Sequence, residues 1–242
     1  MQVLNLSGSP VIAVEGGYQY SLALKADKTV WSWGSNNLGQ MGDTTFTTPR
    51  MIPQRVGLSI GLGNITQLSA GWGHALALRS DGTVWAWGQN DYGQIGDGNR
   101  PANRSTPFQV KGPGGVGVLS NIIMVSGGDC SSAALRADGT VWTWGCNHHN
   151  GFNPPPVGTD PVGQLGNNDP TYTDQPYPVQ VVGGAQGGTF LKSIVLIAAR
   201  DYHNYALASD GTLYSWGSNL NGQLGYGSCC LPGLSPVKVI FP

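Results

Sequence analysis

The chain has 242 residues, with 12 Lys plus Arg against 13 Asp plus Glu, and its charged fraction is only 10 %, whereas ordinary soluble domains have roughly 25 %. Scattered basic residues on a nearly neutral chain do not form the cationic surface needed to bind a nucleic-acid backbone, so nucleic acid is excluded as the expected partner. The longest aliphatic run covers only residues 194–199, too few to cross a bilayer, and we expect no membrane insertion.

Four copies of one pattern follow a ten-residue start, and each copy centres on a Trp-x-Trp-Gly motif, with Tyr as its first residue in the last copy. The motif begins at Trp31, Trp85, Trp142 and Tyr214, which are 54, 57 and 72 residues apart. One four-stranded antiparallel blade of a β-propeller takes roughly 40 to 50 residues plus its longer loops. The spacing therefore predicts an all-β fold: one β-propeller domain over 1–242, built of four-stranded antiparallel blades in repeats 11–64, 65–121, 122–193 and 194–242.

The second copy shows the expected strand plan of one blade. Residues 65–71 alternate in polarity, and residues 74–80 are a run of small and branched apolar residues, typical of a strand buried on both faces. Asp81-Gly82 then predicts a hairpin with a type I′ turn, which needs positive φ at both central positions, before the third strand at 83–88. Residues 106–110 carry a proline near their start, which indicates an outermost edge strand.

The other copies depart from this plan in three places. Residues 1–10 resemble an outermost strand and predict a strand of a preceding blade. Lys28 replaces the turn glycine, so either it accepts a positive φ at roughly 1 to 2 kcal/mol or the turn changes type. In the third copy, 13 extra residues lie between Asn147 and Gly163, in the least repetitive part of the chain.

Three motifs recur in each copy: (A/G)-G-x-x-(H)-(S/A)-x-A-L, then D-G-x-(V/L)-(W/Y)-x-W-G-x-N, then G-Q-x-G. In the second copy they are represented by Gly71, His74, Leu78, Asp81, Gly82, Trp87, Gly88, Asn90, Gly93, Gln94 and Gly96. This pattern resembles the repeat family of the regulator of chromosome condensation, over almost the whole chain. The resemblance implies a propeller that usually has seven blades. We expect the missing blades to come from other chains or from further sequence, with closure by four repeats and an open arc as alternatives.

Propeller connectivity predicts which loops share a face. Loops that join the first and second strands of each blade emerge beside those that join the third and fourth strands. At corresponding places the first set carries Tyr18, Trp72, Asp129 (next to Cys130) and Tyr202; the second set carries Leu38, Tyr92, His148, His149, Phe152 and Asn221. Large side chains on loops over a stiff scaffold are typical of a recognition surface, so we predict partner binding by these residues. The alternative is that the aromatic residues only cover the core edges.

Other prominent residues are expected to be structural. Trp85 and Trp87 lie two apart on a strand, share a face and predict packing between blades. His74 and His203 begin the second strands of their copies, where a structural hydrogen bond is expected.

No residue pattern predicts catalysis, a cofactor or a metal site. The aspartates of the hairpins have turn roles, and neither a nucleophile elbow nor a phosphate loop is present. Cys146, His148 and His149 with Asp160 have the ligand types of a metal site, but adjacent histidines in a loop rich in Asn, Pro and Gly are more typical of solvated residues. The four cysteines lack C-x-x-C spacing and leave the redox compartment open.

We therefore expect a non-catalytic module that binds a protein, a glycan or like subunits. The low charge and the loops rich in Asn, Thr and Gly favour an extracellular surface or virion component over a cytoplasmic one. The family resemblance implies two alternatives. One is an enzyme inhibitor whose aromatic loops plug an active site, and the other is a nucleotide exchange factor for a small GTPase.

Overall fold

The computed structural model describes residues 8–47, 49–148 and 162–241, and in these ranges its regular structure consists of strands and three short 3-10 turns. The strands form four antiparallel sheets, each made of four consecutive strands. The first two sheets comprise β1 (Val11–Gly17), β2 (Tyr20–Lys25), β3 (Val30–Gly34) and β4 (Arg50–Arg55), then β5 (Ile65–Ala70), β6 (His74–Arg79), β7 (Val84–Gly88) and β8 (Arg104–Gln109). The last two comprise β9 (Ile122–Gly127), β10 (Ser131–Arg136), β11 (Val141–Gly145) and β12 (Gln175–Gln180), then β13 (Ile194–Arg200), β14 (His203–Ala208), β15 (Leu213–Gly217) and β16 (Gly233–Lys238).

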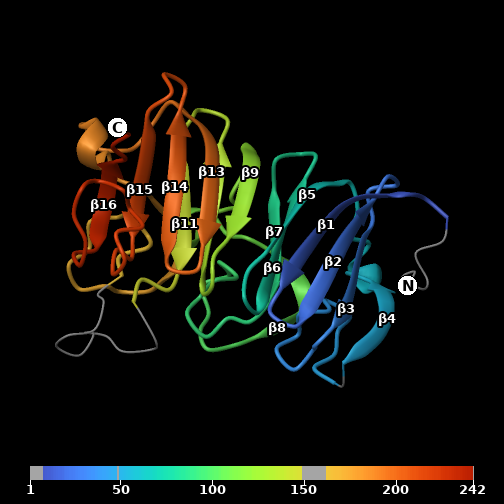
Figure 1. Cartoon of the computed structure of the whole chain (residues 1–242). Coiled ribbons are helices and arrows are strands. Elements are labelled where there is room, and N and C mark those ends of the chain that lie inside the picture. The colour runs from blue at the N-terminus through green and yellow to red at the C-terminus, as the bar shows by residue number, and fades with distance from the viewer. Residues whose placement is uncertain (1–7, 48, 149–161, 242) are drawn as a thin grey trace.

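The four sheets stand side by side as blades, with the first and fourth at opposite ends of the row (Figure 1). The innermost strands β1, β5, β9 and β13 contact one another in that order, and β4, β8, β12 and β16 form the outer edges. The predicted propeller of four-stranded antiparallel blades is confirmed, and the blades do not close into a ring. Most of the strand predicted at 1–10 falls on residues 1–7, outside the described residues. In the described ranges, no helix is long and apolar enough to span a membrane.

Each blade has two unlike faces because successive side chains of a strand point to opposite sides. In the first interface, Leu22 and Leu24 of β2 pack against Ala75, Ala77 and Trp87 of the second blade. The next two interfaces repeat this arrangement. There Leu76 and Leu78 meet Ala134 and Trp144, and Leu135 meets Ala206 and Trp216. The small residues leave room for the indole rings. The second strand therefore presents Leu on the face toward the next blade and Ala on the face toward the preceding blade.

The second tryptophan of each motif joins neighbouring blades by a hydrogen bond. Trp87, Trp144 and Trp216 are fully buried. Their indole N–H groups donate to the backbone carbonyls of Gln40, Gln94 and Gln164 in the preceding blade, at 2.8, 2.9 and 3.0 Å. The predicted packing role of the paired tryptophans is therefore confirmed.

The Asn and Gly-Gln residues of each motif hold the loop that accepts this bond. Asn36 Oδ1 accepts the backbone N–H of Met41 at 3.1 Å, and Gln40 Oε1 accepts that of Leu38 at 2.8 Å. In the second blade, Asn90 Oδ1 accepts the N–H of Ile95 at 3.0 Å. These side chains replace missing backbone partners in an irregular loop, so the constant residues of the motif belong to the scaffold.

The hairpin turns differ from the predicted type I′ geometry. Gly82 has a φ of 77°, but Asp81 is not in the positive-φ region, and Gly82 N–H donates to Arg79 O at 2.9 Å. This is a type I turn followed by one left-handed residue, which needs positive φ only once. Asp81 Oδ1 accepts the backbone N–H and the hydroxyl of Thr83 at 3.0 and 2.6 Å and so fixes the loop. Lys28 accepts the left-handed position with a φ of 66°.

His74 is buried in the interface between the second and third blades. Its Nε2 lies 3.0 Å from Ser132 Oγ, which donates its own hydrogen to Gln94 O at 2.8 Å. A hydroxyl has one hydrogen, so His74 Nε2 must be the donor to Ser132. Burial lowers the pKa of His74 to about 4. The structural role predicted for this histidine is confirmed.

Replacing Trp87 with alanine is expected to lower the free energy of unfolding by about 4 kcal/mol, because it removes a fully buried ring and leaves a cavity between blades. The matched control is Trp33→Ala, since Trp33 has the equivalent position in the first blade and is only partly buried. Urea denaturation followed by circular dichroism measures both losses. Equal losses would contradict the role given to the interface.

His74 predicts that stability falls as pH drops from about 6.5 to about 4. In the unfolded chain histidine takes up a proton near pH 6.5, while folded His74 stays neutral until about pH 4, so the unfolded state binds more protons in this window. The pKa shift corresponds to a loss of about 3 kcal/mol in the free energy of unfolding on acidification. A His74→Gln variant should not show this loss. Urea denaturation at a series of pH values tests this. His203→Gln, at the partly buried equivalent position, should keep most of the wild-type slope.

Candidate functional site

The four loops that join the first and second strands of the blades form one continuous row. Tyr18 N–H donates to Trp72 O at 2.9 Å, Trp72 N–H to Asp129 O at 3.3 Å, and Asp129 N–H to Asp201 O at 3.0 Å. Each blade therefore positions the loop of its neighbour through backbone hydrogen bonds. We call the surface formed by Tyr18, Trp72, Asp129, Asp201 and Tyr202 the mouth surface.

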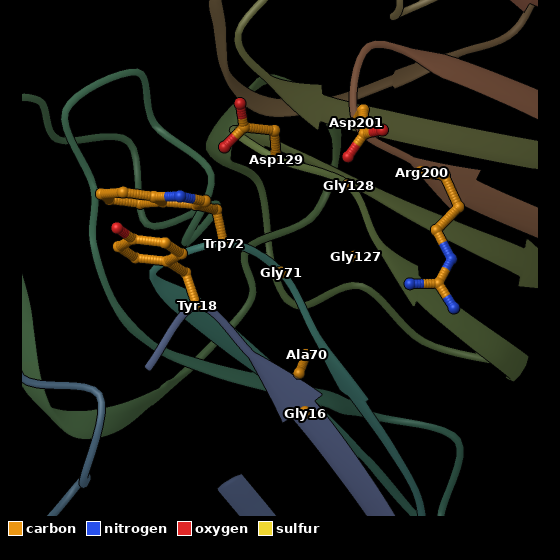
Figure 2. Close-up of a pocket in the computed structure, with 10 residues that line it drawn as sticks. All are labelled: Gly16, Tyr18, Ala70, Gly71, Trp72, Gly127, Gly128, Asp129, Arg200 and Asp201. Carbon is orange, nitrogen blue, oxygen red and sulfur yellow. The ribbon is translucent and has the colours of Figure 1, made fainter. Parts of the chain in front are cut away.

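Glycine allows the loops to approach so closely. A Cβ on Gly17 would lie 2.7 Å from Gly71 O, and one on Gly71 would lie 2.6 Å from Gly128 O. Any side chain at these positions would push neighbouring blades apart. The corresponding residue of the fourth blade is Arg200, whose side chain extends along the hollow shown in Figure 2.

Tyr18 and Trp72 form an exposed aromatic stack on the mouth surface. Their ring centroids are 4.7 Å apart and their planes differ by 11°. They remain 51 % and 41 % exposed, respectively, so the rings do more than close the edge of the core. Figure 2 shows Tyr18 on one face of the indole and Asp129 toward the other.

Two hollows lie beside this stack, and Trp72 and Asp129 line both of them. The first has a volume of about 200 Å³, is floored by the small residues Gly16, Ala70 and Gly127, and has Arg200 and Asp201 on its far side (Figure 2). The second has a volume of about 300 Å³, and we call it the aromatic pocket. It is lined by Trp72, Gln89, Tyr92, Asp129, Cys130, His148 and Tyr202.

Burial and nearby carboxylates raise the pKa values of two tyrosines in the aromatic pocket. Burial, and then the hydrogen bond that its hydroxyl donates to Asp129, raise the pKa of Tyr202 well above its ordinary value. Burial raises the pKa of Tyr92 as well, followed by the negative charges of Asp91, Asp174 and Asp129. Both phenols therefore stay neutral at physiological pH.

The buried carboxylate of Asp174 holds His148, which packs against Tyr92 in the wall of the aromatic pocket. The ring of Tyr92 meets His148 edge-on, with centroids 5.4 Å apart. His148 Nδ1 lies 2.7 Å from Asp174 Oδ1, and Arg100 donates to Asp174 Oδ2 at 2.7 Å. Asn147 N–H adds a third contact to the same carboxylate at 2.9 Å. Asp174 is thus matched by a cation and is less available to a partner than Asp129.

A disulfide between Cys130 and Cys146 ties the two loops of the third blade together beneath the aromatic pocket. Gln164 Nε2 donates to Cys146 Sγ at 2.7 Å. No disulfide was predicted from the cysteine spacing, but the positions of Cys130 and Cys146 relative to the strands indicate one. Cys130 directly precedes one strand and Cys146 follows its antiparallel partner, and Ser131 pairs with Gly145, so the two cysteines lie opposite each other.

The structure brings together six of the ten residues predicted to contact a partner. Tyr18, Trp72, Asp129, Tyr92, His148 and Tyr202 surround the two hollows. Leu38 is half-buried beside Gly73, and Asn221 is exposed on the fourth blade; neither of them lines a hollow. His149 and Phe152 lie outside the described residues.

One predicted correspondence between the copies is corrected by the strand register. Tyr202 was matched with Tyr18 and Trp72, but the backbone hydrogen bond from Asp129 places Asp201 at the equivalent position. Counting two residues back from the start of each second strand also gives Asp201, before His203. Asp201 was not predicted because the neighbouring Tyr202 was assigned to its loop position, and Arg200 and Gln89 also line the hollows without having been predicted.

The described ranges contain no group of three or more His, Cys, Asp or Glu side chains placed to hold a metal ion. Of the ligand types considered from the sequence, Cys146 is committed to the disulfide. His149 and Asp160 lie outside the described residues.

Removing the disulfide with Cys130→Ala/Cys146→Ala is expected to lower the free energy of unfolding by about 2 to 3 kcal/mol, because the bond closes a loop of 16 residues. Urea denaturation with and without dithiothreitol measures the effect. Wild type should lose stability under reduction and the double variant should not. Cys229→Ser/Cys230→Ser, which alters the two exposed thiols, should retain the sensitivity; its loss would contradict the assignment.

Known proteins resemble this chain over most of its length. The ultraviolet-B receptor UVR8 of Arabidopsis thaliana is 31 % identical over 237 residues, which are 98 % of this chain and 48 % of the receptor. The human E3 ubiquitin-protein ligase HERC2 is 30 % identical over 226 residues, 93 % of this chain and 4 % of the ligase. The chain thus spans about half the length of UVR8 and a small part of HERC2.

Solved propellers show the same fold. Human WBSCR16 has a TM-score of 0.79 at 23 % identity, covering 100 % of this chain and 55 % of its own. Prp20p of Saccharomyces cerevisiae has a TM-score of 0.71 at 21 % identity, covering 99 % of this chain and 52 % of its own. The sequence model of the RCC1-like domain matches residues 1–240. The family resemblance drawn from the repeats is confirmed, and this chain belongs to the RCC1-like domain family.

Proposed function

We propose that the chain is a non-catalytic protein-binding module that holds its partner on the mouth surface. The observation that carries the proposal is the exposed stack of Tyr18 and Trp72 beside Asp129, on loops that backbone hydrogen bonds fix to one another. Large aromatic side chains that are already ordered lose little entropy on binding and dominate many protein interfaces.

The carboxylates elsewhere in the described ranges have structural partners, which supports a binding role over catalysis. Asp43 and Asp97 pair with Arg50 and Arg104. The hairpin aspartates accept bonds from threonines two residues later, as Asp138 does from Thr140. Acid-base chemistry needs a carboxyl group held near a reacting atom, and these groups are engaged in loop structure instead.

The relatives support protein binding in general and do not identify the partner. A solved structure of Prp20p is described with its binding to Gsp1p and histones, but at 21 % identity that likeness concerns the fold alone. HERC2 is a ubiquitin ligase, and the match covers 4 % of it, so its activity is not carried over. Glycan binding, association with like subunits and a surface or virion role stay predictions.

Selection of a random-peptide phage library on the immobilised chain tests the proposal. Peptides that use the mouth surface should bind Trp72→Ala about 30-fold more weakly, which corresponds to about 2 kcal/mol for a central aromatic contact. Phe190→Ala is the matched control, because Phe190 is an equally exposed aromatic residue, at 41 %, in the connection between the third and fourth blades. If no selected peptide distinguishes Trp72→Ala from Phe190→Ala, the mouth surface is not the binding surface.

A further inference from the structure

We propose that the aromatic pocket binds a cationic side chain, an arginine or a lysine, of the partner protein. This inference rests on the proposed function and specifies its chemistry. It uses the aromatic pocket, whose lining includes three aromatic residues, Trp72, Tyr92 and Tyr202, and the carboxylate of Asp129.

The walls of the pocket have the composition of a cation site. Trp72, Tyr92 and Tyr202 supply aromatic rings, and Asp129 supplies a carboxylate between them. The face of an aromatic ring carries partial negative charge and attracts an ammonium or guanidinium group, most strongly in the case of tryptophan. The volume of about 300 Å³ accommodates such a group with part of its aliphatic stem.

The ring of Trp72 is fixed before a ligand arrives. Tyr18 stacks on one face of the indole, and the backbone of Trp72 is held by hydrogen bonds with Tyr18 and Asp129 on the neighbouring loops. The disulfide and the contact between Tyr92 and His148 hold the opposite wall. A cation entering this pocket therefore orders few side chains, and less of the binding free energy is lost.

The charges around the pocket favour a cation over an anion or a neutral group. Asp91, Asp129 and Asp174 all act on the Tyr92 hydroxyl, and Asp201 adds to them at Tyr202. Arg100 offsets Asp174.

Arg200 at the first hollow and the nearby Glu15 also carry charge. Arg200 lines that hollow and not the aromatic pocket, and it is close enough to Glu15 to lower that carboxyl's pKa, against the larger effect of burial. Asp129 lines both hollows, and a carboxylate accepts several hydrogen bonds, so it can accept one from an entering guanidinium in addition to the one from Tyr202.

The test titrates the full chain with acetyl-arginine amide and with acetyl-citrulline amide, a neutral compound of nearly the same shape. The indole N–H signal of Trp72, assigned by its absence from a Trp72→Phe variant, is followed by NMR. The arginine compound should shift this signal saturably and bind at least about tenfold more tightly than the citrulline compound. Equal binding of the two, or no saturable shift with the arginine compound, overturns the proposal.

Variants separate the charge effect from folding. Asp129→Asn preserves an acceptor for Tyr202 and should weaken the arginine compound about fivefold or more. Asp210→Asn, an exposed hairpin carboxylate in the fourth blade, is the matched control and should bind like wild type. Unchanged binding by Asp129→Asn overturns the proposal.

The outcomes for this pocket and for the protein-binding function are distinguishable. If phage-selected peptides need Trp72 but keep their affinity when their arginines and lysines are replaced by glutamine, the cation inference fails and protein binding stands. If the arginine compound binds as expected but no selected peptide depends on Trp72, the pocket stands and the proposed function fails.

Discussion

The hydrogen bond from the second tryptophan of one blade to the Gly-Gln loop of the preceding blade sets the arrangement of the molecule. Trp87, Trp144 and Trp216 each cross an interface and reach a carbonyl that has no strand partner. A buried indole N–H without an acceptor is costly, so ring and loop must remain together as the apolar faces close. One residue thereby contributes both apolar burial and a directional contact, which fixes how each blade sits on its neighbour.

The same packing also positions the candidate site. Because each blade has the same orientation relative to the next, their loops lie side by side and can form backbone hydrogen bonds from Tyr18 through Trp72 and Asp129 to Asp201. The scaffold constrains the backbone of these loops and the glycines beside them, but it leaves the displayed side chains free to differ. The chain accordingly has two aromatic residues and two carboxylates at four equivalent positions, and one of each, Trp72 and Asp129, lines the aromatic pocket.

The fold was predictable from the sequence because the blade pattern occurs four times and the packing between blades three times, whereas the site depends on features that occur once. The Trp-x-Trp-Gly motif predicted the blades, and loop connectivity placed Trp72, Tyr92 and Tyr202 on one face. Matching by residue type instead of by distance from the second strand hid Asp201. The prediction of a type I′ turn was wrong because Asp81 stabilises a three-residue loop with a single left-handed position. The disulfide required pairing Cys130 with Cys146 across two strands, which the search for C-x-x-C spacing did not test.

The fourth blade departs from the other three at the positions that contact the next innermost strand. In the first three blades, Glu15, Ser69 and Ser126 accept a backbone N–H from the next innermost strand, and the equivalent residue of the fourth blade is Ala198. The glycine that permits close approach in those blades is likewise replaced, by Arg200. Arg200 has a long charged side chain, and it lies at the first hollow with Asp201. A position at which one copy departs from a contact that the other copies repeat is thus a candidate for another role.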